Sequence, residues 1–323
     1  MKVSTLEKKI LKIREKSPKT LVIGDVMLDH YIFGDVNRIS PEAPVPILNY
    51  KTEKKTLGGC GNVVNNLVNL GGQVLVGTIL GLDKSGEEII NMFSQIGISF
   101  KNSLQFDNIE TTKKIRYLTS SSQLLRLDYE SDKISKEDAL LLFRANMKSL
   151  EKVDNIIISD YGKGVCHPEL IGKVIRVSGK LDKKVFIDPK GSDWSKYKGA
   201  FCITPNIKEA EDLLKIKLRI DTDFENAAKF IKEKFNLNSC LITRGADGMT
   251  YFDGNNFFHQ KVDPQEVYDV SGAGDTVISC FSSCIDSGFN ITDSLKISSY
   301  ISSLVVSHLG TTPFNIGMIK NEK

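Results

Sequence analysis

The sequence predicts an α/β protein built on a mostly parallel sheet with helices on both faces. Short apolar runs rich in β-branched residues alternate with segments of helical periodicity along most of the 323 residues, which is the pattern of repeated βαβ units. Four of the expected strands end at or just before a polar residue: Asp25, Asp160, Asp188 and Asn206. Because ligands bind beyond the carboxyl ends of parallel strands, this repetition indicates an enzyme.

Each element follows from its period and its boundaries. Continuous runs of Val, Ile and Leu predict strands, and apolar residues three and four apart, closed by Gly-Gly or Gly, predict helices. The expected strands are residues 21–25, 73–81, 155–160, 184–188, 201–205 and 239–243. The expected helices are an amphipathic segment within residues 1–20 and residues 60–70, 84–97, 168–179, 207–215, 222–235, 273–288 and 292–308.

Two stretches depart from the strand–helix alternation. Residues about 30–57 and about 100–129 have the composition of short strands joined by turns, so they predict a small sheet set apart from the main one. Such a sheet would serve as a lid over the site or as a pairing surface for a second subunit. With no internal repeat and no long linker, we expect one catalytic domain over residues 1–323.

Composition excludes several classes of function. The formal net charge is +3 without a long Lys/Arg block, which argues against nucleic-acid binding. No apolar run approaches the roughly 18 residues of a membrane span, and no signal-peptide core is present. The six cysteines lack a CxxC pair and are expected to be free thiols of a cytoplasmic protein.

The most informative segment joins Gly272, Ala273, Gly274 and Asp275 at the start of an apolar helix. A Gly-rich turn at a helix start presents several backbone N–H groups in one direction, and the helix dipole adds positive charge there. An acid inside such an anion site is sensible when it takes a proton from a hydroxyl that attacks a bound phosphoryl group. The competing interpretation is an ordinary helix cap with Asp in the first turn.

Together with a second segment, this one resembles the ribokinase-like (PfkB) carbohydrate kinases from end to end. The second segment carries Gly58, Gly59 and Asn62 in a GG-x-x-N pattern. The resemblance implies a three-layer α/β/α sandwich with a mostly parallel sheet and a small β-sheet lid. Five further stretches resemble the D-glycero-D-manno-heptose 7-phosphate kinases: residues 24–31, 37–46, 123–128, 159–164 and 187–191.

The resemblance implies a role for each matching residue. Asp275 would be the base, with the amides from Gly272 to Gly274 holding the transferred phosphate. Asp29 and Asn62 would bind sugar hydroxyls, and Gly58 and Gly59 would let the chain approach the sugar; a loop cap and a helix cap are the respective alternatives for Asp29 and Asn62. Cations for a phosphate already on the sugar are sought among Arg38, Arg116, Arg126 and Lys163.

The nucleotide side is assigned in the same way. Asn206 and Glu209 match an N-x-x-E element that would reach Mg²⁺ through water, although the same spacing makes a capping box. Lys190 would neutralise ATP phosphates, with a solvated loop lysine as the alternative. A surface charge is likewise the alternative for Arg244. The remaining expected nucleotide contacts come from one loop: Thr243, Arg244, Gly245 and Gly248.

The function implied is ATP- and Mg²⁺-dependent phosphorylation of the anomeric 1-hydroxyl of D-glycero-D-manno-heptose 7-phosphate. The product, heptose 1,7-bisphosphate, would feed nucleotide-heptose and surface-glycan synthesis, by an α- or β-anomer route that the sequence does not distinguish. The chain resembles the stand-alone kinases of this branch, since it has no HxGH motif of a cytidylyltransferase-type domain. A homodimer through the lid and a monovalent cation such as K⁺ are further expectations.

Two other functions remain open at this point. One is the same chemistry on ribose, fructose 1-phosphate or a nucleoside. The other is a catalytically silent sugar-phosphate sensor, against which the intact Gly272, Gly274 and Asp275 argue.

Overall fold

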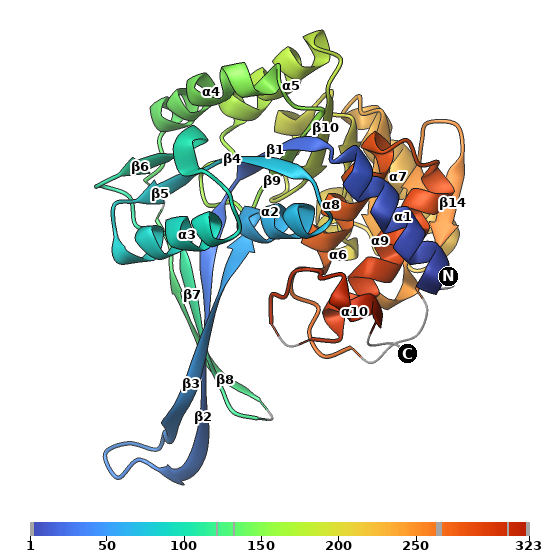
Figure 1. The fold of residues 1–323 in the computed structure, drawn as a ribbon. Helices are drawn as coiled ribbons and strands as arrows, with labels where there is room; N and C mark the ends of the chain where they lie inside the picture. The colour runs from blue at the N-terminus through green and yellow to red at the C-terminus, as the bar shows by residue number, and fades with distance from the viewer. Residues whose placement is uncertain (1–2, 121, 132, 263–266, 309, 321–323) are drawn as a thin grey trace.

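An eight-stranded sheet forms the centre of the molecule (Figure 1). The structure is a computed structural model that describes residues 3–120, 122–131, 133–262, 267–308 and 310–320. The strands are, in spatial order, β14 (Phe257–Gln260), β13 (Met249–Phe252), β12 (Ser239–Thr243), β11 (Cys202–Ile203), β10 (Lys184–Asp188), β9 (Asn155–Ser159), β1 (Lys19–Gly24) and β4 (Gln73–Gly77). The six strands from β12 to β4 are parallel, and β13 and β14 extend the sheet antiparallel.

Helices cover both faces of this sheet, because its strands are apolar on both sides. Leu21 and Ile23 face one buried cluster, while Val22 between them faces the other. The first cluster is covered by α4 (Lys136–Leu150), α5 (Pro168–Lys180), α6 (Ile207–Leu214) and α7 (Asp221–Lys234). The second is covered by α2 (Cys60–Asn69), α3 (Lys84–Gln95), α8 (Ala273–Asp286) and α9 (Ile291–Val306). The predicted three-layer α/β/α sandwich is confirmed.

A third cluster lies outside the second helical layer. It joins the buried sides of α8 and α9 to α1 (Val3–Lys16) and to α10 (Gly317–Lys320) through Leu6, Ile10 and Ile319. The N-terminal helix is therefore part of the packed body, although its Lys-rich side faces solvent. In the described part of the chain, no helix is long and apolar enough to cross a membrane.

A four-stranded sheet projects from the body, as expected from the two strand-rich stretches (Figure 1). We call it the small sheet. Its strands are, in spatial order, β3 (Pro46–Gly59), β2 (Val26–Ile39), β7 (Lys113–Leu118) and β8 (Gln123–Tyr129). Because β2 continues almost directly from β1, and β3 runs straight into α2, the small sheet grows out of the body next to the strand ends.

Some predicted boundaries are wrong. The first stretch, expected to hold short strands over about 30–57, holds two strands of 14 residues each. The first of them begins earlier than expected, at Val26, and the second ends later, at Gly59. The expected strand 73–81 breaks into β4 and β5 (Ile79–Gly81), and β5 pairs with β6 (Leu104–Phe106) outside the small sheet. The helix α4 and the hairpin β13–β14 were not among the expected elements.

Candidate active site

Asp275 lies in the first turn of α8 and is only 2% exposed. The turn before it requires glycine: Gly272 has a φ of 81°, and a Cβ there would stand 2.6 Å from the Asn62 side-chain nitrogen. Gly274 has no atom within 4 Å of its missing Cβ, so the chain is open at that point. The Ala273 N–H donates to the Val270 carbonyl at 3.2 Å, so one of the three expected phosphate-binding amides already has a partner.

Two donors hold the Asp275 carboxylate from opposite sides. Asn62 Nδ2 donates to Oδ2 and the Tyr161 hydroxyl donates to Oδ1, each at 2.8 Å. Burial raises the pKa of Asp275 to about 7, against these two hydrogen bonds, which lower it, and the nearby Asp29 raises it further. A carboxyl group with a pKa near neutrality is well suited to accept a proton from a hydroxyl.

A pocket of about 170 Å³ opens beside Asp275 at the carboxyl ends of the parallel strands. Such an edge is where doubly covered sheets bind ligands. The pocket is lined by Asp160, Tyr161, Asp188, Pro189, Lys190, Thr204, Asn206, Glu209, Thr243, Gly272, Gly274 and Asp275. The structure thus brings together predicted residues from both the phosphate-transfer and the nucleotide sets, which are far apart in the sequence.

A second cavity, of about 400 Å³, continues from this pocket and shares Lys190, Asn206 and Glu209 with it. Asn206 and Glu209 form a reciprocal capping box at the start of α6, with Asn206 Oδ1 accepting from the Glu209 N–H at 2.9 Å. The capping interpretation of this pair is therefore confirmed. The Lys190 ammonium lies 3.2 Å from Glu209 Oε1, and its side chain is half exposed at the edge of the cavity.

The Thr243–Gly248 loop contributes unequally to the pocket. Thr243 lines it, but the Arg244 side chain turns away, donates to Asp221 at 2.7 Å and lies 4.2 Å from the centre of the Phe224 ring. Gly245 and Gly248 both have positive φ angles, and a Cβ on Gly248 would meet the Gln260 carbonyl oxygen at 1.8 Å. The positive φ and the close contact with β14 are sufficient to explain why residue 248 is a glycine.

Asp29 stands on β2 at the base of the small sheet and is 3% exposed. Its carboxylate accepts from Arg116 at 2.6 Å and from the Thr311 hydroxyl at 3.0 Å. Gly58 leaves room for this carboxylate, since a Cβ there would stand 2.2 Å from Asp29 Oδ2. The next residue, Gly59, is close to Asp25 instead: a Cβ there would stand 2.4 Å from the Asp25 carbonyl oxygen.

The four cations expected to bind a sugar phosphate do not all meet. Arg116 is paired with Asp29, Arg126 with Asp128, and Lys163 with Glu130. Arg38 is exposed near the far end of β2, nine residues beyond Asp29 or about 30 Å along the strand. The structure therefore places Arg38 far from the active site of its own chain.

Sequence reasoning gave no role to several residues that the structure places here. Tyr161 was part of a family-like stretch, but nothing in its spacing pointed to Asp275. Lys114 stands beside Asp29 in the small sheet, and burial lowers its pKa. Burial and then the neighbouring Asp275 raise the pKa of Asp188, which had been noted only as a strand end. Thr311 comes from a loop without any recognisable pattern.

Solved structures share this architecture. Ribokinase from Arabidopsis thaliana, complexed with ribose and ATP, superposes with a TM-score of 0.74 at 18% identity, over 94% of this chain and 98% of that one. Phosphofructokinase-2 from Escherichia coli, in complex with substrates and products, gives 0.77 at 16% identity, over 94% and 97%. These likenesses show the fold, which is that of the ribokinase-like kinases.

The fold and the acid at its Gly-rich helix start define a sugar kinase, a phosphotransferase acting on an alcohol group. The chain belongs to the pfkB family of carbohydrate kinases, whose sequence model matches residues 17–316. The family implies ATP as the phosphate donor and, with it, Mg²⁺.

Curated relatives include two proteins named bifunctional protein HldE. That of Aliarcobacter butzleri is 42% identical over 92% of this chain and 62% of the relative. That of Sulfurimonas denitrificans is 40% identical over 95% of this chain and 65% of the relative. The chain thus spans less than two thirds of the length of these relatives.

Proposed function

We propose that this chain transfers the γ-phosphoryl group of ATP to the anomeric 1-hydroxyl of D-glycero-D-manno-heptose 7-phosphate. The observation that carries the proposal is the buried Asp275 carboxylate, held by two donors at a Gly-rich helix start beside a pocket. The heptose-like stretches of the sequence and the HldE relatives favour this substrate class.

The chain's own residues divide the reaction between them. Asp29 accepts hydrogen bonds from sugar hydroxyls and, with the small sheet, places the sugar over the pocket. Asp275 takes the proton of the 1-hydroxyl as its oxygen attacks the γ-phosphorus and the bond to the β-phosphate oxygen breaks. The open backbone at Gly274, which follows the Gly272 turn at the positive end of α8, faces the transferred group.

The nucleotide phosphates fit the cavity that continues past Lys190, whose ammonium would leave Glu209 to neutralise them. The donor set there suits Mg²⁺, which prefers carboxylate oxygens and water. Asp188 and Glu209 both line the pocket. Burial, then Asp275 and then Glu209 raise the pKa of Asp188, so a cation bound between these carboxylates would offset their repulsion. Asp188, together with Asn206 and Glu209 through water, would hold the ion, which would offset charge on the transferring phosphate.

We place the 7-phosphate of the sugar on the small sheet. Asp29 and Lys114 are register partners, as are Lys114 and Asp128, so their side chains share one face with Arg116 and Arg126. Lys163 and Arg126 are close enough to Lys114 to contribute to its lowered pKa, after burial. Three cations beside a sugar-binding acid favour an anionic sugar. Lys114 joins the predicted Arg126 and Lys163 in this group.

The opposite face of the small sheet supports the expected homodimer. Ile32, Tyr117 and Leu125 form one row across it, and Ile115 and Leu127 belong to the next. Leu125 is 58% exposed in the single chain, so a second copy would cover apolar area there.

Coupled ADP release with Mg·ATP tests the reaction. We expect turnover with D-glycero-D-manno-heptose 7-phosphate, offered as separate anomers, and at least about a hundredfold lower kcat/KM with ribose or fructose 6-phosphate. A phosphate on carbon 1 in the product would establish the position. Turnover with a control sugar alone would remove the heptose assignment and retain a sugar kinase.

Lys114→Met is expected to raise the KM for the sugar 7-phosphate about 10- to 100-fold, because it removes one charge-assisted contact worth about 1.5–3 kcal/mol. The KM for ATP should stay the same. Lys113→Met is the matched control: this neighbour points to the other face, where its ammonium lies 4.2 Å from the Tyr129 ring centre. Equal effects of the two substitutions on the sugar KM would contradict a phosphate site at Lys114.

Activity should depend on pH through Asp275. The base works only when ionised, so kcat/KM is expected to fall about tenfold per pH unit below about 7, where burial has placed its pKa. The substrate phosphate titrates near 6, so its own titration must be measured and divided out. A profile that stays flat down to about pH 6 would exclude Asp275 as the group that takes the proton.

A further inference from the structure

Tyr161 touches the Asp275 carboxylate through a hydroxyl that no sequence pattern had assigned. It donates to Oδ1 at 2.8 Å, while Asn62 donates to Oδ2 at the same distance, so each carboxylate oxygen has one fixed partner. A carboxylate has about four lone-pair positions, which leaves room for an incoming hydroxyl. The arrangement fixes the plane of the carboxylate without filling it.

Both donors are anchored by one residue, Asp25. Its carboxylate accepts the backbone N–H groups of Tyr161, Lys163 and Val165 at 2.8, 3.1 and 3.0 Å. Its carbonyl accepts the N–H of Cys60 at 2.9 Å. Cys60 is the first residue of α2, the helix that carries Asn62. Asp25 therefore sets the start of the Tyr161 loop and the start of the Asn62 helix at once.

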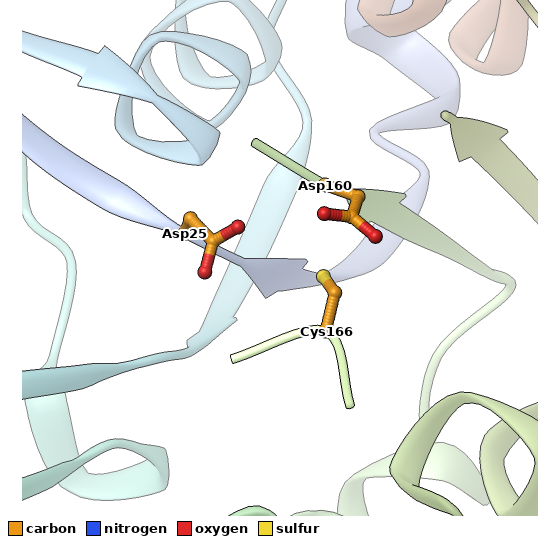
Figure 2. Close-up of side chains that lie close together, drawn as sticks. All are labelled: Asp25, Asp160 and Cys166. Carbon is orange, nitrogen blue, oxygen red and sulfur yellow. The ribbon is translucent and has the colours of Figure 1, made fainter. Parts of the chain in front are cut away.

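The surrounding cluster is explained as part of this scaffold. Asp25, Asp160 and Cys166 lie within 4.8 Å of one another, and Figure 2 shows the two carboxylates facing each other just beyond their strands. Such a group suggests a metal site, but its oxygens already have partners. Asp25 has the three N–H groups above, and Asp160 has Lys196, the Tyr197 hydroxyl at 2.7 Å and the Gly162 N–H at 2.8 Å.

We propose that Tyr161 is a positioning residue of the kinase, which with Asn62 holds the Asp275 carboxylate in the orientation and ionised form that the reaction needs, both donors being set by Asp25. This inference rests on the proposed role of Asp275 as base. It changes the role of Asn62 from sugar ligand to partner of the base. Tyr161 itself stays neutral, since burial and then Asp275 raise the pKa of its hydroxyl well above the usual range.

The charged and titratable groups around Asp275 define what else could move its titration. Asp29 on β2 raises the pKa of Asp275. Asp275 in turn raises the pKa of three neighbours, which are Cys60 on α2, Asp188 at the end of β10, and Tyr161. Of these, Tyr161 alone donates a hydrogen bond to the carboxylate. Asp25 is a further buried acid of this region, and burial and then Asp160 raise its pKa to about 6.

The test is the pH profile of Tyr161→Phe. Loss of one hydrogen bond to an ionised group should move the acid limb of kcat/KM upward by about one to two pH units. At pH 7 the variant should lose about 5- to 50-fold in kcat/KM, and most of this loss should be recovered near pH 9. Damage to the fold would not be recovered by raising the pH. An acid limb that stays in place would overturn the proposal.

Tyr197→Phe is the matched control. It removes a hydroxyl that bonds Asp160 and the Lys190 N–H, at 2.7 and 3.0 Å, from the same region of the site. Its acid limb should coincide with that of the unmodified chain. An equal shift in both variants would show a general loosening of the loops, and so contradict a specific role of Tyr161.

A second measurement needs no substrate. The pH dependence of the free energy of unfolding, compared with that of Asp275→Asn, reports the pKa of Asp275 in the folded chain. If the heptose assay fails but Tyr161→Phe raises this pKa, the proposed function fails and the inference about Tyr161 survives. If the pKa is the same in Tyr161→Phe and the unmodified chain, the inference fails by itself.

Discussion

Asp275→Asn is expected to lower kcat by a factor of about 10²–10⁴, the range contributed by a positioned general base. An amide cannot take the hydroxyl proton, yet it fills the same space. Its oxygen can accept from Asn62, and its nitrogen can donate to the Tyr161 hydroxyl, so the local hydrogen bonds survive. Coupled ADP release at saturating substrates measures the loss. More than about a tenth of the original kcat in the variant would contradict the base.

The same substitution should stabilise the folded chain at alkaline pH. The pKa of Asp275 is raised from 3.8 to about 7, first by burial. An acid with a raised folded-state pKa contributes stability below its unfolded pKa, and this is lost as the pH rises through the folded value. At about pH 8 the free energy of unfolding of Asp275→Asn should therefore exceed that of the unmodified chain by on the order of 2–4 kcal/mol. The difference should shrink toward about pH 5 in urea titrations.

Asp286→Asn is the matched control for the loss of kcat. Asp286 lies at the other end of α8, its side chain is only 6% exposed, and its pKa is raised first by burial. Its partners are Asn155 and Lys184, at the opposite edge of the sheet from the pocket. The control should keep its kcat, which would show that the loss in Asp275→Asn depends on place and not on removing a buried acid from this helix.

Arg116→Met is expected to destabilise the chain by about 3–5 kcal/mol, because it leaves the Asp29 carboxylate buried with one charged partner removed. The side chains of this pair are 15% and 5% exposed. The methionine keeps part of the packing against the Tyr31 ring, over which the guanidinium now lies at 5.0 Å. Urea titration measures the change, and the KM for the sugar should rise as Asp29 loses its fixed orientation.

A double substitution separates charge from packing. Adding Asp29→Asn to Arg116→Met removes the unpaired charge, so it should restore a large part of the lost free energy of unfolding. Arg126→Met provides the comparison, since Arg126 is the register partner of Arg116 but its pair with Asp128 is 49% exposed on the arginine side. Arg126→Met should lower the free energy of unfolding by less than about 1 kcal/mol. Equal losses of unfolding free energy in Arg116→Met and Arg126→Met would contradict a buried ion pair between Arg116 and Asp29.

Most strands of the main sheet, most helices and the helix start at Asp275 could be predicted because each leaves a local signal. Apolar period and strand-end acids marked β1, β9 and β10, and the glycines marked the start of α8. The 14-residue length of β2 and β3 left no such signal, since their outer halves are largely exposed and mix apolar and polar residues without a regular alternation.

Partners within the site were out of reach for a different reason. Asn62 and Asp275 are 213 residues apart, and Tyr161 is 114 residues from Asp275. Hydrophobic periodicity and composition carry information over about ten residues, so they cannot predict which donor contacts which carboxylate oxygen of Asp275. The same limit explains Arg38, which like Arg126 belongs to a family-like stretch but lies along a strand that carries it away from the body.

The position of β1 bears on how the chain is made. In the finished sheet β1 lies between β4 and β9, and β9 comes about 130 residues after it. At synthesis rates of about 5–20 residues per second, one edge of this Val- and Ile-rich strand stays unpaired for on the order of ten seconds on the ribosome. Such an edge invites pairing with other chains. Productive folding therefore depends on what shields the nascent N-terminal part until residues 155–159 emerge.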